Sequence, residues 1–117
     1  MFNFFGRKDN GVDVTAEEVN RRRAAGEKLY VLDVREPAEY ADARVAGSVL
    51  IPLGQLAQRV GELPKDRTIV AICASGGRSS AAVGLLKRAG FADVLNLRGG
   101  IGAWARSGLP IERGRKR

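Results

Sequence analysis

Apolar residues along this chain occur in short blocks that alternate with segments of helical character. The blocks are rich in Val, Ile and Leu, which is typical of buried strands. The predicted strands cover residues 29–34, 48–51, 68–72 and 93–97. Helices are predicted at residues 16–25, 37–40, 53–60 and 79–89, and around residues 103–105. Strands that alternate with helices favour an α/β fold, in which helices cover both faces of a parallel sheet.

Local signals refine this pattern. Thr15 stands three residues before Glu18, the spacing of a capping box, so the first helix is expected to begin directly after Thr15. Gly90 is placed to end the fourth helix. Residues 68–72 form the most hydrophobic strand, which is therefore expected at the centre of the sheet. Ligands of such folds bind beyond the carboxyl ends of the strands, and Cys73 stands at that end.

Length and composition suit one globular domain. The chain has 117 residues, of which 44% are hydrophobic and 28% charged, a balance that argues against a disordered or membrane protein. Its longest apolar runs are too short to span a bilayer. We expect a flexible N-terminal arm at residues 1–11, a folded domain at 12–111 and a basic tail at 112–117. The aromatic residues of the arm are the one hint of self-association, so a monomer and a homodimer both stay open.

The numbers of charged residues, cysteines and histidines exclude several classes of function. The net charge of +7 attracts anions, but the basic residues are dispersed and not interleaved with aromatic side chains, so no specific nucleic-acid binding is expected. The chain has one cysteine and no histidine. This excludes an intramolecular disulfide and a histidine-based triad, and it argues against zinc. We expect no cofactor and, since a single thiol suits a reducing compartment and no export signal is visible, a cytoplasmic location.

The segment after Cys73 has the composition of an anion pocket. Gly76 and Gly77 permit unusual backbone dihedral angles, and Arg78 adds a permanent cation just before the predicted helix. A loop that leads into a helix directs backbone N–H groups and the positive end of the helix dipole towards one point. The same field stabilises a thiolate. Cys73 is therefore a candidate nucleophile; the alternative is that it is a small buried core residue.

Two kinds of chemistry use a cysteine in such a cradle: attack on phosphorus, and attack on a sulfane sulfur. Phosphatase loops place five residues between the cysteine and the arginine, whereas four separate Cys73 from Arg78. The shorter loop and the absence of a preceding aspartate favour sulfur chemistry. An arsenate or phosphate-ester enzyme is the less favoured alternative.

Four segments, taken together and in order, resemble the rhodanese-like domain family. Leu32 to Tyr40 resembles the family's early motif, and Ala46 to Leu53 the segment that follows it. Cys73 to Ser79 is similar to the active-site loop, and Leu97 to Trp104 to the closing motif. The resemblance covers residues 12–111 and implies a three-layer α/β fold with a central, mainly parallel, five-stranded sheet.

The resemblance also implies a thiosulfate sulfurtransferase. Sulfane sulfur would pass from a small anionic donor such as thiosulfate to cyanide or a thiol through a persulfide on Cys73, with Arg78 orienting the donor. The substrate-binding cradle maps to the remaining loop residues, namely Ala74, Ser75, Gly76, Gly77 and Ser79. Ser79 is equally suited to cap the helix, and the two roles are compatible. A persulfide carrier that delivers sulfur to a partner protein is the alternative.

Two positions depart from the family pattern. Arg44 stands where many members have a histidine, and Leu50 where many have an asparagine. We expect these changes to affect local packing or substrate approach. Arg44, together with Asp33 and Arg35 at the end of a predicted strand, is a candidate for the pocket rim. A structural ion pair or turn anchor is the alternative for Asp33 and Arg35.

Overall fold

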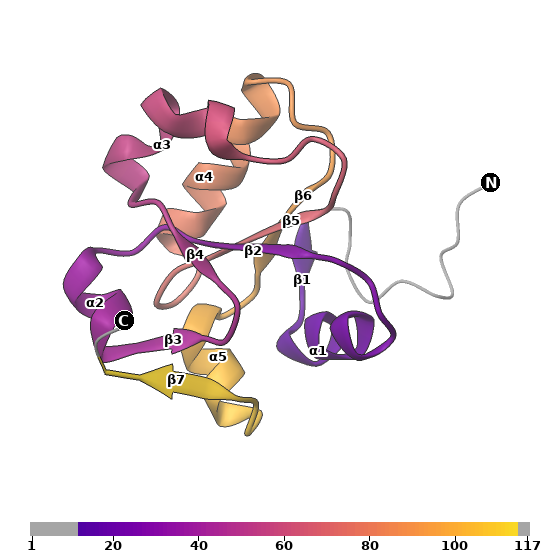
Figure 1. Ribbon diagram of the computed structural model, residues 1–117, viewed down its shortest axis with the longest axis vertical. Helices are drawn as coiled ribbons and strands as arrows, with labels where there is room; N and C mark the ends of the chain where they lie inside the picture. Colours follow the sequence, from indigo (N-terminus) through magenta and orange to yellow (C-terminus); the bar gives the residue numbers. More distant parts are fainter. Residues whose placement is uncertain (1–11, 115–117) are drawn as a thin grey trace.

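Five short parallel strands form a single sheet at the centre of the molecule (Figure 1). The computed structural model describes residues 12–114, so the predicted arm at residues 1–11 and residues 115–117 of the predicted tail lie outside it. The order across the sheet is β1-β6-β5-β2-β4. These strands are β1 (Asp13–Val14), β2 (Tyr30–Asp33), β4 (Val49–Leu50), β5 (Ile69–Ile72) and β6 (Val94–Leu97). The most hydrophobic predicted strand, β5, lies at the centre, and the predicted parallel sheet is confirmed.

Helices cover both faces of this sheet, as predicted. Helices α3 (Leu53–Arg59) and α4 (Gly77–Arg88) pack on one face, and α1 (Ala16–Ala24) and α5 (Gly100–Arg106) on the other (Figure 1). Because side chains of a strand point alternately to opposite faces, Ile69, Ala71 and Cys73 join the core beneath α3 and α4. Val70 and Ile72 join the core on the other side. The register of β5 therefore directs Cys73 towards α4.

The termini of the helices agree closely with their sequence signals, with one exception. The Thr15 side chain accepts a hydrogen bond from the Glu18 backbone N–H at 3.1 Å, which caps α1 as predicted. Helix α4 begins at Gly77 and not at residue 79. Gly76 is its N-cap residue and adopts a positive φ of 114°, which favours glycine. Gly77 and Arg78 thus belong to the first helical turn and not to a free loop.

The sequence did not correctly predict the short polar helices and strands. Strands β3 (Ala43–Val45) and β7 (Ile111–Arg113) form a separate antiparallel pair, which the hydrophobic pattern did not predict. Helix α2 (Pro37–Asp42) is longer than the predicted turn, and a 3-10 turn, η2 (Val60–Glu62), extends α3. Strand β7 ends at Arg113, within the expected basic tail, and the domain boundary at residue 111 stays a prediction. Such short elements contain too few apolar residues to give a periodic signal.

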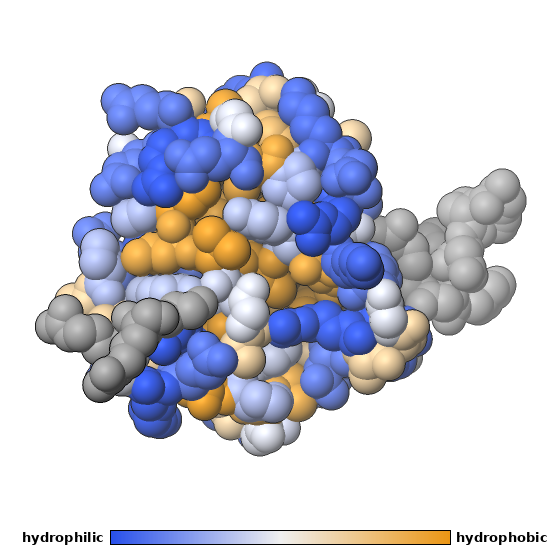
Figure 2. All heavy atoms as spheres, in the orientation of Figure 1, coloured by the Kyte–Doolittle hydropathy of each residue, from blue (hydrophilic) through white to orange (hydrophobic). Residues whose placement is uncertain are grey.

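The surface combines hydrophilic side chains with a limited apolar area. Figure 2 shows apolar side chains gathered across the middle of one face, between areas of hydrophilic side chains above and below. Among the described residues, two large apolar side chains are exposed, with exposed fractions of 47% for Val12 and 42% for Val49. Within residues 12–114, no helix has the length and hydrophobicity needed to cross a membrane.

Candidate active site

Cys73 lies at the junction between the central strand and the helix that follows it. It comes directly after β5, and its side chain is buried, with 1% of the residue exposed. Of the residues that follow, Ser75 and Gly77 are exposed and Ala74 and Gly76 are partly buried. The buried sulfur therefore lies beneath a segment in which Ser75 and Gly77 face solvent, and an anion pocket at this point stays a prediction.

Hydrogen-bond donors surround the sulfur atom. The Gly76 backbone N–H donates to Cys73 Sγ at 3.1 Å, and the Ser79 hydroxyl oxygen lies 3.3 Å from it. Burial by itself raises the pKa of the Cys73 thiol, but hydrogen bonds from the Ser79 side chain and from the backbone of Ser79, Gly76 and Ser75 lower it, and the net pKa shift is downward. Helix α4 directs its positive N-terminal end towards the same sulfur. This arrangement favours a thiolate without a histidine base.

Arg78 is paired with a carboxylate from another element. Its two terminal nitrogens donate to both oxygens of Glu39 on α2, at 2.8 and 2.9 Å. The hydrogen bond from Arg78 is the main cause that lowers the pKa of Glu39 from 4.5 to about 2, and the Glu39 carboxylate in turn raises the pKa of Arg78. The sequence predicted an arginine directed at the donor anion. The structure shows a bidentate ion pair that joins α4 to α2 and offsets part of the positive charge, and the role of Arg78 towards a donor stays a prediction.

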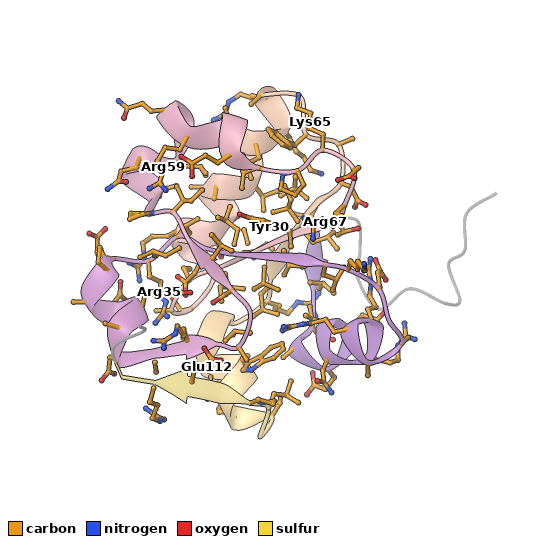
Figure 3. The ribbon with its side chains drawn as sticks, viewed as in Figure 1. Tyr30, Arg35, Arg59, Lys65, Arg67 and Glu112 are labelled. Atoms are coloured by element: carbon orange, nitrogen blue, oxygen red, sulfur yellow. The ribbon has the colours of Figure 1, made fainter. Side chains whose placement is uncertain are left out.

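Two of the predicted rim residues, Asp33 and Arg35, form a buried ion pair with each other. The Arg35 Nη2 and Asp33 Oδ2 atoms are 2.8 Å apart, and the residues are 4% and 0% exposed. Arg35 also donates to the Ala43 carbonyl oxygen at 2.6 Å, on the side of the molecule that carries α2 (Figure 3). The pair thus anchors the turn after β2 to strand β3, the alternative that the sequence left open. A role of either residue at the pocket rim stays a prediction.

The third predicted rim residue, Arg44, is also buried. Its Nη1 atom donates to the carbonyl oxygens of Tyr40 and Gly114, at 3.0 and 2.7 Å. Its Nε atom lies 3.4 Å from a carboxylate oxygen of Glu112 on β7, a residue labelled in Figure 3. These contacts place Arg44 in the packing between α2 and the β3–β7 pair. The structure thus shows where Arg44 packs, whereas an effect of this departure from the family pattern on packing or on substrate approach stays a prediction.

The first turn of α5 holds the backbone around Cys73 in position. The Ile101 backbone N–H donates to the Cys73 carbonyl oxygen at 2.8 Å, and the Gly102 N–H to the Ala74 carbonyl oxygen at 3.3 Å. Gly100 adopts a φ of +60°, and a Cβ atom there would lie 2.3 Å from the Cys73 carbonyl oxygen. The hydrophobic pattern of the sequence did not predict this contact. The glycine pair at the start of α5 was the available signal, because a glycine is required where two backbones approach closely.

A polar network behind the sulfur was also missed. The Ser79 hydroxyl donates to Asn96 Oδ1, and Asn96 Nδ2 donates to an Asp13 carboxylate oxygen at 3.1 Å. Ser79 is fully buried and Asn96 is 7% exposed. The sequence signal that could have indicated this network was Asn96, the one polar residue within the otherwise apolar strand β6. Among residues 12–114, no group of three or more His, Cys, Asp or Glu side chains is arranged to hold a metal ion.

Known proteins are similar to this chain in sequence and in fold. The family model of the rhodanese-like domain matches residues 15–107. A protein named "Sulfurtransferase" from Allochromatium vinosum is 42% identical over 99 residues, which are 85% of this chain and 92% of that protein. The "Putative sulfur carrier protein YrkF" of Bacillus subtilis is 38% identical over 92 residues, which are 79% of this chain but only 50% of that protein. The crystal structure of a rhodanese-related protein from Thermoplasma volcanium superposes with a TM-score of 0.79 at 34% identity and covers 86% of this chain and 97% of that one.

Proposed function

This chain belongs to the rhodanese-like domain family, and we propose that it is a sulfurtransferase that carries sulfane sulfur as a persulfide on Cys73. The observation that carries the proposal is the position of Cys73 Sγ, which receives a hydrogen bond from the Gly76 N–H at the start of α4. A sulfur atom held by N–H donors at a helix N-terminus is stabilised as an anion. Both the attacking thiolate and a bound persulfide benefit from that field.

In the first step, the Cys73 thiolate attacks the outer sulfur of a donor such as thiosulfate. A new S–S bond forms on Cys73, and the sulfur–sulfur bond of thiosulfate breaks. Sulfite leaves with the bonding electron pair, and the negative charge that remains on Cys73 resides on the terminal persulfide sulfur. Backbone N–H groups of the cradle from Ala74 to Gly77 stabilise this charge.

In the second step, an acceptor such as cyanide or a thiolate attacks the terminal sulfur. The persulfide S–S bond breaks, its electron pair returns to Cys73 as a thiolate, and thiocyanate or the acceptor persulfide is released. The hydrogen bonds from Gly76 and Ser79 to Sγ stabilise this leaving group. A reducing, cytoplasmic setting would keep the single thiol available between cycles.

Arg78 contributes through its position as much as through its charge. Because it is bound to both oxygens of Glu39, it holds the start of α4 against α2. Its guanidinium also interacts electrostatically with Cys73. We propose that an incoming anionic donor competes with Glu39 for this guanidinium, so that Glu39 restrains donor binding.

Thiocyanate formation from thiosulfate and cyanide tests the proposal directly. The wild-type chain is expected to turn over, and Cys73→Ser to lose the activity because its hydroxyl is not ionised at neutral pH. The matched control is Ser80→Ala, because Ser80 is an exposed serine on the same helix. Turnover by Cys73→Ser equal to that of wild type would refute the mechanism.

A persulfide carrier that serves a partner protein is the second candidate. It is favoured by the similarity to YrkF, which is named a putative sulfur carrier protein, and by the burial of Cys73, which is 1% exposed so that little solvent reaches its Sγ. Mass spectrometry after thiosulfate treatment separates the two functions. A stable gain of one sulfur atom with negligible thiocyanate production would favour the carrier, whereas rapid thiocyanate production would favour the enzyme.

A further inference from the structure

The Ser79 hydroxyl has several possible acceptors but only one proton. Its oxygen lies 3.3 Å from Cys73 Sγ, 3.3 Å from the Gly76 carbonyl oxygen, and closer still to Asn96 Oδ1. A serine hydroxyl donates one hydrogen bond at a time and accepts others. Ser79 is fully buried, so solvent does not compete for this proton. Ser79 can therefore donate its proton either to the sulfur or to one of its two oxygen acceptors, but not to both at once.

Asp13 decides which end of the Asn96 amide faces Ser79. Asn96 Nδ2 donates to Asp13 Oδ1 at 3.1 Å, and a carboxylate only accepts hydrogen bonds. With the amide nitrogen directed at Asp13, the amide oxygen is directed at Ser79. Asn96 consequently accepts the Ser79 proton and has no N–H to donate to the serine oxygen.

The direction of the Ser79 proton then depends on the charge of the sulfur. When Cys73 is a thiol, its S–H can donate to Ser79 Oγ while Ser79 donates to Asn96. When the thiol proton is lost to water, the Sγ anion keeps the hydrogen bond from the Gly76 N–H, and Ser79 supplies a further donor by turning from Asn96 towards it. That turn leaves Asn96 Oδ1, in a residue 7% exposed, without its donor, which is unfavourable.

We propose that Asn96 is a positioning residue that acts on Cys73 through Ser79. Its amide oxygen, held in place by Asp13, competes with the sulfur for the Ser79 proton. The consequence for catalysis rests on the proposed sulfur-transfer cycle. In that cycle, Sγ carries a negative charge before it attacks the donor and again when it leaves the persulfide. Between these steps Sγ is an uncharged bridging sulfur, and the Ser79 proton returns to Asn96. Anion stabilisation by Ser79 is thereby confined to the steps that need it.

The test measures the acidity of Cys73 and does not require sulfur transfer. Cys73 is the only cysteine in the chain, so alkylation by iodoacetamide at a series of pH values reports its thiolate alone. Asn96→Leu keeps a similar volume and removes the acceptor nearest to the Ser79 hydroxyl, so that only the more distant Gly76 carbonyl oxygen competes with the sulfur. We expect the acid dissociation constant of the thiol to rise about fivefold, the change that one typical net hydrogen bond produces. The charges that act on the sulfur, Arg78 and its partner Glu39, are unchanged in this variant.

A double-mutant comparison isolates the route through Ser79. In a Ser79→Ala background, Asn96→Leu is expected to have no further effect on the dissociation constant, because the shared proton is gone. Asp13→Ala frees the Asn96 amide to rotate and is expected to raise the acid dissociation constant of the Cys73 thiol, as Asn96→Leu does. It replaces Asn96→Leu in the test if that variant does not fold. An unchanged or lower dissociation constant in the folded variants overturns the proposal. So does a shift that persists in the Ser79→Ala background.

These outcomes are separable from a failure of the proposed function. Loss of thiocyanate formation bears on sulfur transfer, while alkylation bears on the thiol alone. A chain without sulfurtransferase activity would still show the fivefold change if Asn96 acts through Ser79.

Discussion

Gly100 offers a sharp test of how the backbone around Cys73 is held. A Cβ atom at this position would lie 2.3 Å from the Cys73 carbonyl oxygen and 2.6 Å from the carbonyl carbon and oxygen of Ala74. All three contacts are with backbone, which cannot rotate away as a side chain can. In Gly100→Ala the two segments must therefore separate by about one ångström to reach the ordinary contact distance of 3.4 Å.

The cost of this separation follows from the contacts it breaks. The hydrogen bonds from Ile101 N–H to the Cys73 carbonyl and from Gly102 N–H to the Ala74 carbonyl would lengthen beyond useful range. Each contributes about 1 kcal/mol net, and a non-glycine residue at positive φ costs about 1 kcal/mol more. We expect Gly100→Ala to lower the free energy of unfolding by about 3 kcal/mol.

Gly108→Ala is the matched control. Gly108 also has a positive φ, of 72°, but no atom lies within 4 Å of a Cβ built there, so only the backbone strain of about 1 kcal/mol applies. Urea unfolding measures both variants, and iodoacetamide alkylation reports whether the Cys73 cradle has shifted. We expect slower alkylation at neutral pH in Gly100→Ala alone, because displaced N–H donors raise the pKa of the thiol. Equal unfolding midpoints and equal alkylation rates for the two variants would refute the reasoning.

Two further predictions concern the ion pairs. Because the pKa of Glu39 is lowered to about 2, its pairing with Arg78 stabilises the fold above pH 4.5, and this contribution is lost as the pH falls towards 2. The free energy of unfolding, measured in urea at several pH values, should depend less on pH in the acid range for Glu39→Gln than for the control Glu62→Gln, which removes a surface ion pair with Arg59. Identical pH profiles for the two variants would contradict the stabilising role of the Glu39–Arg78 pair. Asp33→Ala should destabilise the fold by about 3–5 kcal/mol because it leaves the buried Arg35 charge unpaired. The double variant Asp33→Ala/Arg35→Met should recover part of that loss in the same assay, and a larger loss in the double variant would show that the charge is not the cause.

The sequence by itself determined the parts of this protein that depend on local composition. The apolar blocks predicted the parallel sheet and the central place of β5, because a strand with no charged side chain is stable only where both of its faces are covered. The same pattern placed Cys73 at the carboxyl end of β5, ahead of a helix. Thr15 predicted the start of α1, since an N-cap requires only residues within one turn.

Tertiary structure alone decided which polar groups meet around that cysteine. Arg78 pairs with Glu39, Ser79 with Asn96, and the Gly100 backbone lies against Cys73, although the members of each pair are far apart in the sequence. Hydrophobic periodicity indicates which face of an element is buried, but it carries no information about the partner of a polar side chain on another element. Those partners are set by how the strands and helices pack. For this reason the sequence was enough to propose Cys73 as the nucleophile, while the groups that hold its backbone and direct its hydrogen bonds emerged only from the fold.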